Sequence, residues 1–218
     1  MSIKQILVHV DDAPASEARL QAALALESRR ATGMHDRLPI LLARQGRAAD
    51  LTVVGPAGGE GGGDDALLAE AAFMDTGRPA LVVPPAWAGT LPPARALVAW
   101  DGSREAARAA GDAVPLLQHA AEVTVLVVDA HAAGPRFGDQ PGAGLTAFLA
   151  RHAVKARVKH VAGIAGGPGP TILAQAKEER ADLLVMGGYG HSRVREMLFG
   201  GTTRHILDHT NAPVLLAH

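Results

Sequence analysis

A series of three segments occurs twice along the chain, and this repeat restricts the possible folds more than any other feature. Each copy begins with an apolar run that ends at aspartate, continues with an Ala-Asp-Leu run that ends at glycine, and closes with proline and a further apolar run. Because the segments keep the same order, a tandem duplication is the simplest interpretation. The three pairs are residues 3–10 and 96–100, residues 49–55 and 181–187, and residues 77–83 and 211–217.

The first copy is much shorter than the second. The interval from Asp11 to Asp50 is about half as long as the interval from Asp101 to Asp182. The complete copy is therefore predicted to read β-α-β-α-β-α-β-α-β, and the short copy β-α-α-β-α-β. The elements predicted only in the second copy are a strand at 122–128, a helix at about 145–152 and a strand at 156–161.

Strands that alternate with helices predict an α/β fold with doubly wound, Rossmann-like parallel sheets and right-handed crossovers. We expect a shortened domain at residues 1–85 and a complete domain at residues 94–218, joined by a stiff, proline-rich linker at 84–93. The complete domain should have the strand order 3-2-1-4-5. Loss of strands two and three would leave strands 1, 4 and 5 side by side in the first domain. These strands are predicted at residues 3–10, 51–54 and 80–83.

The composition agrees with such a fold and excludes several classes of function. Apolar residues make up 48% of the chain but aromatic residues only 3%, so the core must consist of Ala, Val and Leu, as in strands buried on both faces. The absence of cysteine excludes disulfides, thiolate catalysis and cysteine-based zinc sites. A net charge of −1 gives no sign of binding to nucleic acid or to an anionic membrane. With no membrane-length apolar stretch and no cleavable leader, the expected location is the cytoplasm.

A glycine-rich segment follows the strand that ends the second Ala-Asp-Leu run. Glycines allow the backbone to approach a phosphate, and successive N–H groups can surround an anion. The N-terminus of the following helix, at 204–209, would add free donors, and Thr202 and Thr203 lie where a cap or a phosphate-binding hydroxyl would lie. The alternative interpretation is a structural turn with a helix cap. The glycines concerned are Gly187, Gly190, Gly200 and Gly201.

Residues 94–218 resemble the universal stress protein family over nearly all of their length. The resemblance rests on the Val-Ala-Trp-Asp-Gly-Ser run at 98–103, the strand at 181–187, the G-x2-G-x9-G spacing of the glycines just named, and the final strand at 212–216. The combination is far more specific than any one of these features. It implies the α/β fold predicted above and a role in the response to stress.

In ATP-binding members of that family, the matching positions surround the nucleotide. The resemblance implies that Ala99, Trp100 and Asp101 line the adenine side and that Val128 covers the base. It also implies that residues of the glycine-rich segment hold the ribose and the phosphates. These residues are Met186, Gly187, Tyr189, Gly190, Gly200, Gly201, Thr202 and Thr203.

The chain departs from the family pattern at Gly201, where ATP-binding members have serine or threonine. The loss of a hydroxyl directed at phosphate removes one charge-assisted hydrogen bond, which corresponds to about ten- to hundredfold weaker binding. Thr202 or Thr203 could replace it, one or two residues further on.

The first copy resembles the family more faintly. Gly55 and Gly58 keep the first glycine step, but Leu68 stands where the next glycine belongs, and the strand that would cover the base is expected to be missing. We therefore expect no nucleotide in this half. In the family, the last strands of two domains pair antiparallel in a dimer, so the strands at 80–83 and 214–217 are predicted to pair within this one chain.

Three functions are compatible with these features. The first is a stress-response protein that binds ATP or another adenine nucleotide, with Mg²⁺ only as the partner of ATP. The second is a nucleotide-free interaction and dimerisation scaffold, and the third, the weakest, is a slow ATPase. No catalytic residue and no metal site is predicted, because His205 and His209 lack the glutamate of a His-Glu-x-x-His motif. The expected partners are a second copy of the chain and an unknown signalling protein.

Overall fold

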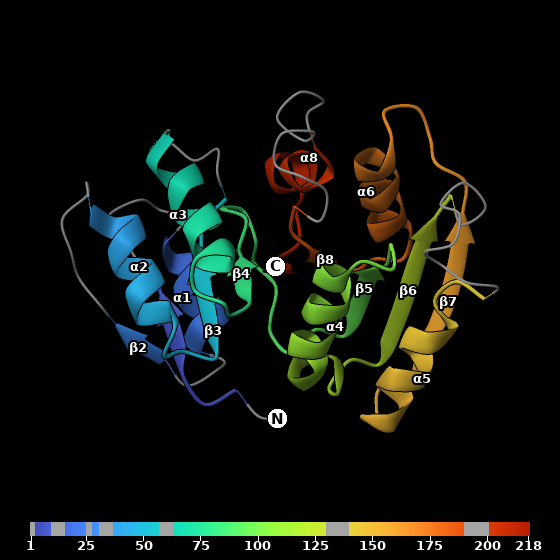
Figure 1. The fold of residues 1–218 in the computed structure, drawn as a ribbon, viewed down its shortest axis with the longest axis horizontal. Helices are drawn as coiled ribbons and strands as arrows, with labels where there is room; N and C mark the ends of the chain where they lie inside the picture. The colour runs from blue at the N-terminus through green and yellow to red at the C-terminus, as the bar shows by residue number, and fades with distance from the viewer. Residues whose placement is uncertain are drawn as a thin grey trace.

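A computed structural model describes residues 3–9, 16–24, 28–30, 37–56, 63–129, 140–189 and 201–218. Within these residues the chain forms one nine-stranded sheet with helices on both faces (Figure 1). None of the helices in these ranges is long and apolar enough to cross a membrane. The strands are β1 (Ile6–Val8), β2 (Ser28–Arg30), β3 (Leu51–Val54), β4 (Ala80–Val82), β5 (Arg95–Ala99), β6 (Glu122–Val128), β7 (Ala156–Val161), β8 (Leu183–Gly187) and β9 (Val214–Ala217). The helices are α1 (Ser16–Leu24), α2 (Leu38–Gly46), α3 (Gly63–Met74), α4 (Arg104–Leu117), α5 (Ala143–Arg151), α6 (Pro168–Glu178) and α8 (Thr202–His209).

The strand order confirms the α/β fold predicted for the second half. The order across the sheet is β2-β1-β3-β4-β9-β8-β5-β6-β7, and all neighbours are parallel except β4 and β9. Read from β7 to β9, this is the predicted order 3-2-1-4-5. In the first half β1, β3 and β4 are neighbours, with Ile6 opposite Leu51 and Val53 opposite Leu81, so the prediction of three contiguous parallel strands is also confirmed.

The prediction that the first half holds only strands 1, 4 and 5 is wrong. A second strand, β2, pairs in parallel with β1, with Ser28 opposite Ile6 and Arg30 opposite Val8. It occupies the position of the strand that we expected to be missing. Its three residues, Ser-Arg-Arg, include no apolar residue, so the sequence has no hydrophobic pattern there to indicate a strand. An outer strand such as β2, which within the described residues pairs along one edge, tolerates this composition.

The antiparallel pair β4–β9 joins the two halves into one sheet and confirms the predicted pairing of the two last strands. Ala80 lies opposite Leu216, Leu81 opposite Leu215, and Val82 opposite Val214. All six side chains are fully buried. Two strand edges that would otherwise expose unpaired N–H and C=O groups therefore satisfy each other in the middle of the sheet.

Two apolar layers cover the two faces of the sheet, and each layer runs through both halves. Adjacent residues on a strand alternate between them, as Leu215 and Leu216 do. The layer under α1, α4 and α5 also contains Trp87 and Leu91 from the linker, which are only 9% and 7% exposed. The linker is thus part of the core rather than a free tether. The opposite layer lies under α2, α3, α6 and α8.

The shared layer predicts that both halves unfold together. Trp87→Ala should lower the free energy of unfolding by about 3–5 kcal/mol, because it empties a large buried site in the apolar layer that both halves share. Urea denaturation followed by circular dichroism measures this loss. Thr90→Ala, at an exposed position in the same linker, is the control and should change stability little. Two separate unfolding transitions in the wild-type protein would contradict a shared core.

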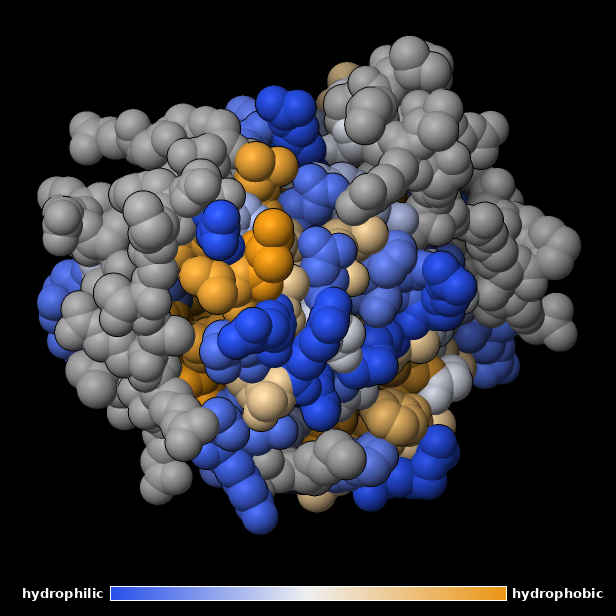
Figure 2. All heavy atoms as spheres, turned by 60° about the vertical axis from the view of Figure 1, so that its left-hand side comes forward, coloured by the Kyte–Doolittle hydropathy of each residue, from blue (hydrophilic) through white to orange (hydrophobic). Residues whose placement is uncertain are grey.

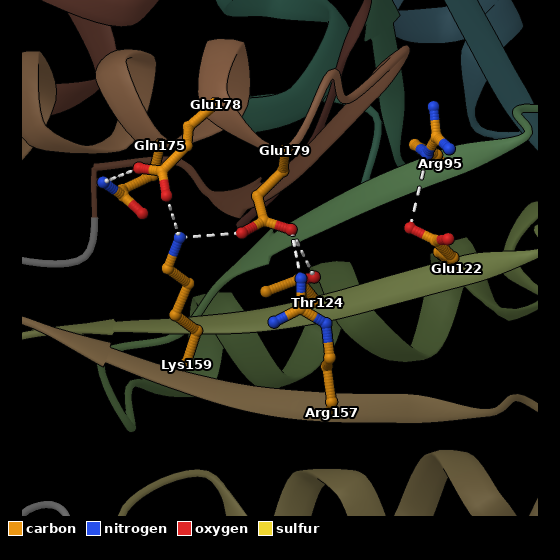
Figure 3. Close-up of polar contacts among 8 residues, drawn as sticks. All are labelled: Arg95, Glu122, Thr124, Arg157, Lys159, Gln175, Glu178 and Glu179. Carbon is orange, nitrogen blue, oxygen red and sulfur yellow. Dashed lines mark hydrogen bonds and ion pairs between the residues drawn. The ribbon is translucent and has the colours of Figure 1, made fainter.

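A charged network attaches the end of α6 to β6 and β7 (Figure 3). Lys159 Nζ lies 2.9 Å from Glu178 Oε1 and 2.7 Å from Glu179 Oε1, while Arg157 and Thr124 both bond to the other oxygen of Glu179. Hydrogen bonds from Lys159 hold the pKa of both carboxyls below the usual range, and those carboxylates raise the pKa of Lys159. Charges directed inward from an outer strand such as β7 also oppose pairing with another chain.

These shifts give the network a definite pH dependence. The carboxyls stabilise the fold fully above their unfolded pKa of about 4.3 and lose this effect as pH falls through their lower folded pKa. Lys159 contributes fully below about 10.4 and loses its effect as pH rises through its higher folded pKa. Lys159→Gln should therefore lower the melting temperature most near neutral pH, and the difference from wild type should shrink in acid and in strong base.

Thermal melts from pH 3 to pH 11 measure this difference. The control is Arg95→Gln, which breaks the ion pair between Arg95 and Glu122. The two side chains of this pair are 43% and 59% exposed. Such a pair is worth about 0–1 kcal/mol. A Lys159→Gln difference that stays constant across the pH range would show that the network does not stabilise the fold through its charges.

Candidate functional site

The predicted site residues gather at the edge of the sheet where β5, β6 and β8 end. These strands are parallel neighbours, so their carboxyl ends lie at the same edge, and β5 and β8 form the switch point of the second half. Ala99 ends β5, Val128 ends β6, and Met186 and Gly187 end β8. The predicted contacts of Gly190 and Gly200 lie outside the described residues.

At the end of β5, Asp101 closes a turn. Its exposed carboxylate accepts hydrogen bonds from the backbone N–H of Ser103 at 3.0 Å and from the Ser103 hydroxyl at 2.6 Å. Ser103 in turn caps α4, because its Oγ accepts from the N–H of Ala106 at 3.1 Å. Gly102, at φ 74°, has the left-handed backbone that this turn requires. The turn fixes the Asp101 carboxylate just beyond the end of β5.

The side chains expected around the adenine are partly buried. The backbone N–H of Trp100 donates to the backbone carbonyl of Leu126 at 2.9 Å, which continues the β5–β6 ladder past the end of β5. Trp100 packs on the core layer under α4, whereas Ala99 and Val128 pack on the opposite layer. Apolar side chains at the ends of β5 and β6 thus leave a partly exposed apolar edge, which suits a planar base.

Gly187 is required by packing alone. A Cβ at this position would lie 2.6 Å from the backbone nitrogen of Ala106 and 2.8 Å from the Cβ of Glu105. The first turn of α4 therefore rests directly on the end of β8. This contact explains the glycine without any ligand.

The two residues after Gly187 are held firmly. The N–H of Gly188 donates to the carbonyl of Ala217 at 2.9 Å, and the N–H of Tyr189 donates to Thr203 Oγ1 at 3.3 Å. Tyr189 has φ 50°, a left-handed backbone that side chains other than glycine adopt rarely. Thr203, which is 2% exposed, thus uses its hydroxyl to support this backbone.

The N-terminus of α8 faces the same region. Gly201 is its N-cap, with φ −51° and ψ 154°, and no side chain of the described residues caps the helix there. This backbone is open to any residue, so Gly201 is not required for conformational reasons. Of the two threonines that could replace the missing hydroxyl, Thr203 already contacts Tyr189, and Thr202 stands partly exposed at the first helical position.

Two buried charged residues near the strand ends were not predicted from the sequence. Glu105, 3% exposed, lies over Gly187 and pairs with Arg104. Burial raises the pKa of Glu105, but the Arg104 hydrogen bond and further favourable contacts outweigh it, so the pKa lies below its usual value. In the first half Arg19, also 3% exposed, fills the space over Gly55, where a Cβ would overlap its Nη1. The sign of them in the sequence is a charged residue on the side of α1 and of α4 that faces the sheet.

The described residues contain no group of three or more potential metal ligands. His205 and His209 stack with ring centroids 4.4 Å apart, and His209 Nδ1 lies 2.8 Å from the carbonyl of His205. The two rings thus contact each other and the helix backbone.

A substitution at Gly187 separates packing from ligand binding. Gly187→Ala should lower the free energy of unfolding by about 1–3 kcal/mol without any ligand, because the added methyl group meets the backbone of α4. Gly111→Ala is the control within α4: no atom lies within 4 Å of its new Cβ, so helix propensity should raise stability by about 0.5–1 kcal/mol. Chemical denaturation measures both. A neutral Gly187→Ala would contradict the packing explanation.

Comparison with known proteins agrees with this geometry. The model of the universal stress protein family matches residues 94–218, more than half of the chain. Universal stress protein Slr1230 from Synechocystis sp. is 43% identical over 44 residues, which is 20% of this chain and only 15% of that relative. The match therefore spans far less than two thirds of that protein.

Two solved structures share the fold. A universal stress protein from Archaeoglobus fulgidus aligns with 82% of this chain and 64% of its own, at 21% identity and a TM-score of 0.63. The functionally unknown protein PA1789 from Pseudomonas aeruginosa aligns with 99% of this chain and 92% of its own, at 14% identity and a TM-score of 0.60. On the match to the family model over residues 94–218, this chain belongs to the universal stress protein family.

Proposed function

We propose that this chain is a cytoplasmic stress-response protein whose second half binds an adenine nucleotide, ATP in the first place, between the ends of β5 and β8. The observation that carries the proposal is the N-terminus of α8, which lacks a side-chain cap among the described residues and lies beside the glycine segment. Free N–H groups and the positive end of the helix dipole favour a phosphate there. Val128 and the backbone at Ala99 and Trp100 would take the base, and Mg²⁺ would accompany the triphosphate.

The proposal divides the chain into a shortened repeat at 1–85 and a complete repeat at 94–218. It is supported by the matching neighbours on the two sides of the central pair, β1-β3-β4 and β5-β8-β9. The antiparallel central pair fits a pseudo-two-fold axis between the repeats. Only the second repeat is proposed to bind nucleotide, since Leu68 stands in the first repeat where the pattern requires a glycine.

The residue that departs from the family pattern provides the test. Gly201→Ser should tighten MgATP binding about tenfold, because the hydroxyl adds one hydrogen bond to a charged phosphate. The backbone of Gly201, at φ −51°, accepts serine without strain. Isothermal titration calorimetry measures the affinity, and native mass spectrometry shows whether nucleotide co-purifies with the protein.

Gly201→Ala is the matched control, because it adds the Cβ without the hydroxyl. It should leave the affinity close to that of wild type. An equal gain in both variants would assign the effect to the helix backbone rather than to a phosphate contact. Absence of binding at millimolar MgATP in wild type and in Gly201→Ser would sink the nucleotide proposal.

The second candidate is a nucleotide-free dimerisation scaffold. It is favoured by the packing explanation of Gly187 and by apolar side chains on the face that carries α2 and α3 (Figure 2). Ile40 and Leu67 on these helices are 72% and 54% exposed. In this case light scattering should find a dimer without nucleotide, and Ile40→Glu should convert it to a monomer.

A further inference from the structure

We propose that the shortened first half supports the nucleotide site of the second half through Phe73 on α3. Phe73 would be a positioning residue: it holds Gly188 and Tyr189 in place and does not itself contact the nucleotide. The inference rests on the proposed nucleotide binding. Through Phe73, the first half would support a site that is formed at the ends of strands of the second half.

Phe73 lies in close contact with Gly188 and Tyr189. The Phe73 and Tyr189 rings stack, with centroids 5.6 Å apart and an interplanar angle of 28°. A Cβ on Gly188 would lie 2.6 Å from Phe73 Cε2 and 2.9 Å from its Cδ2. Gly188 therefore allows the ring to lie against the main chain of the segment. Phe73 is 1% exposed, so its position is fixed by the core around it.

The segment needs support from its surroundings, because Tyr189 has a left-handed backbone at φ 50°. Several contacts of the described residues hold it. Thr203 on α8 accepts the Tyr189 N–H, Ala217 on β9 accepts the Gly188 N–H, and His218 Nδ1 lies 3.0 Å from the Gly188 carbonyl oxygen. A further support is the ring of Phe73, and among the contacts just named it alone comes from the first half. The stack thus lies against Gly188 and Tyr189, between the end of β8 and the Thr203 hydroxyl on α8. The end of β8 and the N-terminus of α8 are the two parts of the proposed phosphate site.

The space beside the stack is open. A groove of about 620 Å³ lies between α3 and α8, and both rings line it together with Pro84 and Pro85 after β4 and Leu207 on α8. A displaced Tyr189 ring would have room there. Removal of Phe73 should therefore free Tyr189 to move instead of leaving it locked by other side chains.

The test uses the fact that Tyr189 is the one tyrosine in the sequence. Protein labelled with 3-fluorotyrosine has a single ¹⁹F signal, which reports on this ring alone. Phe73→Leu keeps an apolar side chain but removes the stacked ring. It should shift the ¹⁹F signal and weaken MgATP binding about three- to tenfold, as expected for one aromatic pair. MgATP should also shift the wild-type signal.

The control is Leu42→Ala on α2, a residue that is 7% exposed in the same core layer of the first half. It should lower the melting temperature but leave the ¹⁹F signal and the affinity as in wild type. If Leu42→Ala weakens binding as much as Phe73→Leu does, the effect is general loss of stability and the inference is wrong.

Further outcomes separate this inference from the proposed function. If wild type binds MgATP and Phe73→Leu binds it equally well, only the inference fails. If wild type binds no MgATP, both fail. Should Phe73→Leu not fold, Phe73→Tyr and Phe73→Met replace it in the MgATP titration: the first keeps the stacked ring and should bind as wild type does, and the second removes the ring and should weaken binding. Equal affinities in these two variants would overturn the inference.

Discussion

The antiparallel pair β4–β9 is the contact on which the rest of the structure depends. Small sheets bury too little apolar surface to be stable alone, and the first half is the smaller of the two. The central pair makes one sheet from both halves, so that each apolar layer continues from one half to the other. Burial of Trp87 within the shared layer follows from this continuity.

The same packing changes how the glycines are interpreted. Gly187 ends β8 and Gly55 directly follows β3, and each lies under a buried charged residue of the first helix of its half, Glu105 or Arg19. A glycine at this point is needed whether or not phosphate binds. A glycine at the strand end is therefore no sign of phosphate binding, whereas the start of α8, which no side chain of the described residues caps, is such a sign.

Much of the fold could be predicted because burial leaves a periodic signal in the sequence. The strands of the second half follow from apolar runs and their repeat, their order follows from the doubly wound fold, and the β4–β9 pair follows from the resemblance to the family. The strand β2 could not be found, because Ser28, Arg29 and Arg30 carry no such signal. The contact of Phe73 with Tyr189 could not be found either, because it joins residues of different halves and depends on where α3 lies against the end of β8.

The first half packs against the second as a support. Arg19 fills the space over Gly55, so no ligand is needed to complete the packing there. In contrast, α3 brings Phe73 against Gly188 and Tyr189 of the other half. An outer strand can be shortened without disturbing either contact, because β2 lies at the far edge of the sheet from the central pair. Val54 on β3 and Val82 on β4 share an apolar layer with Leu68 and Phe73 on α3, so these strands hold α3 in place.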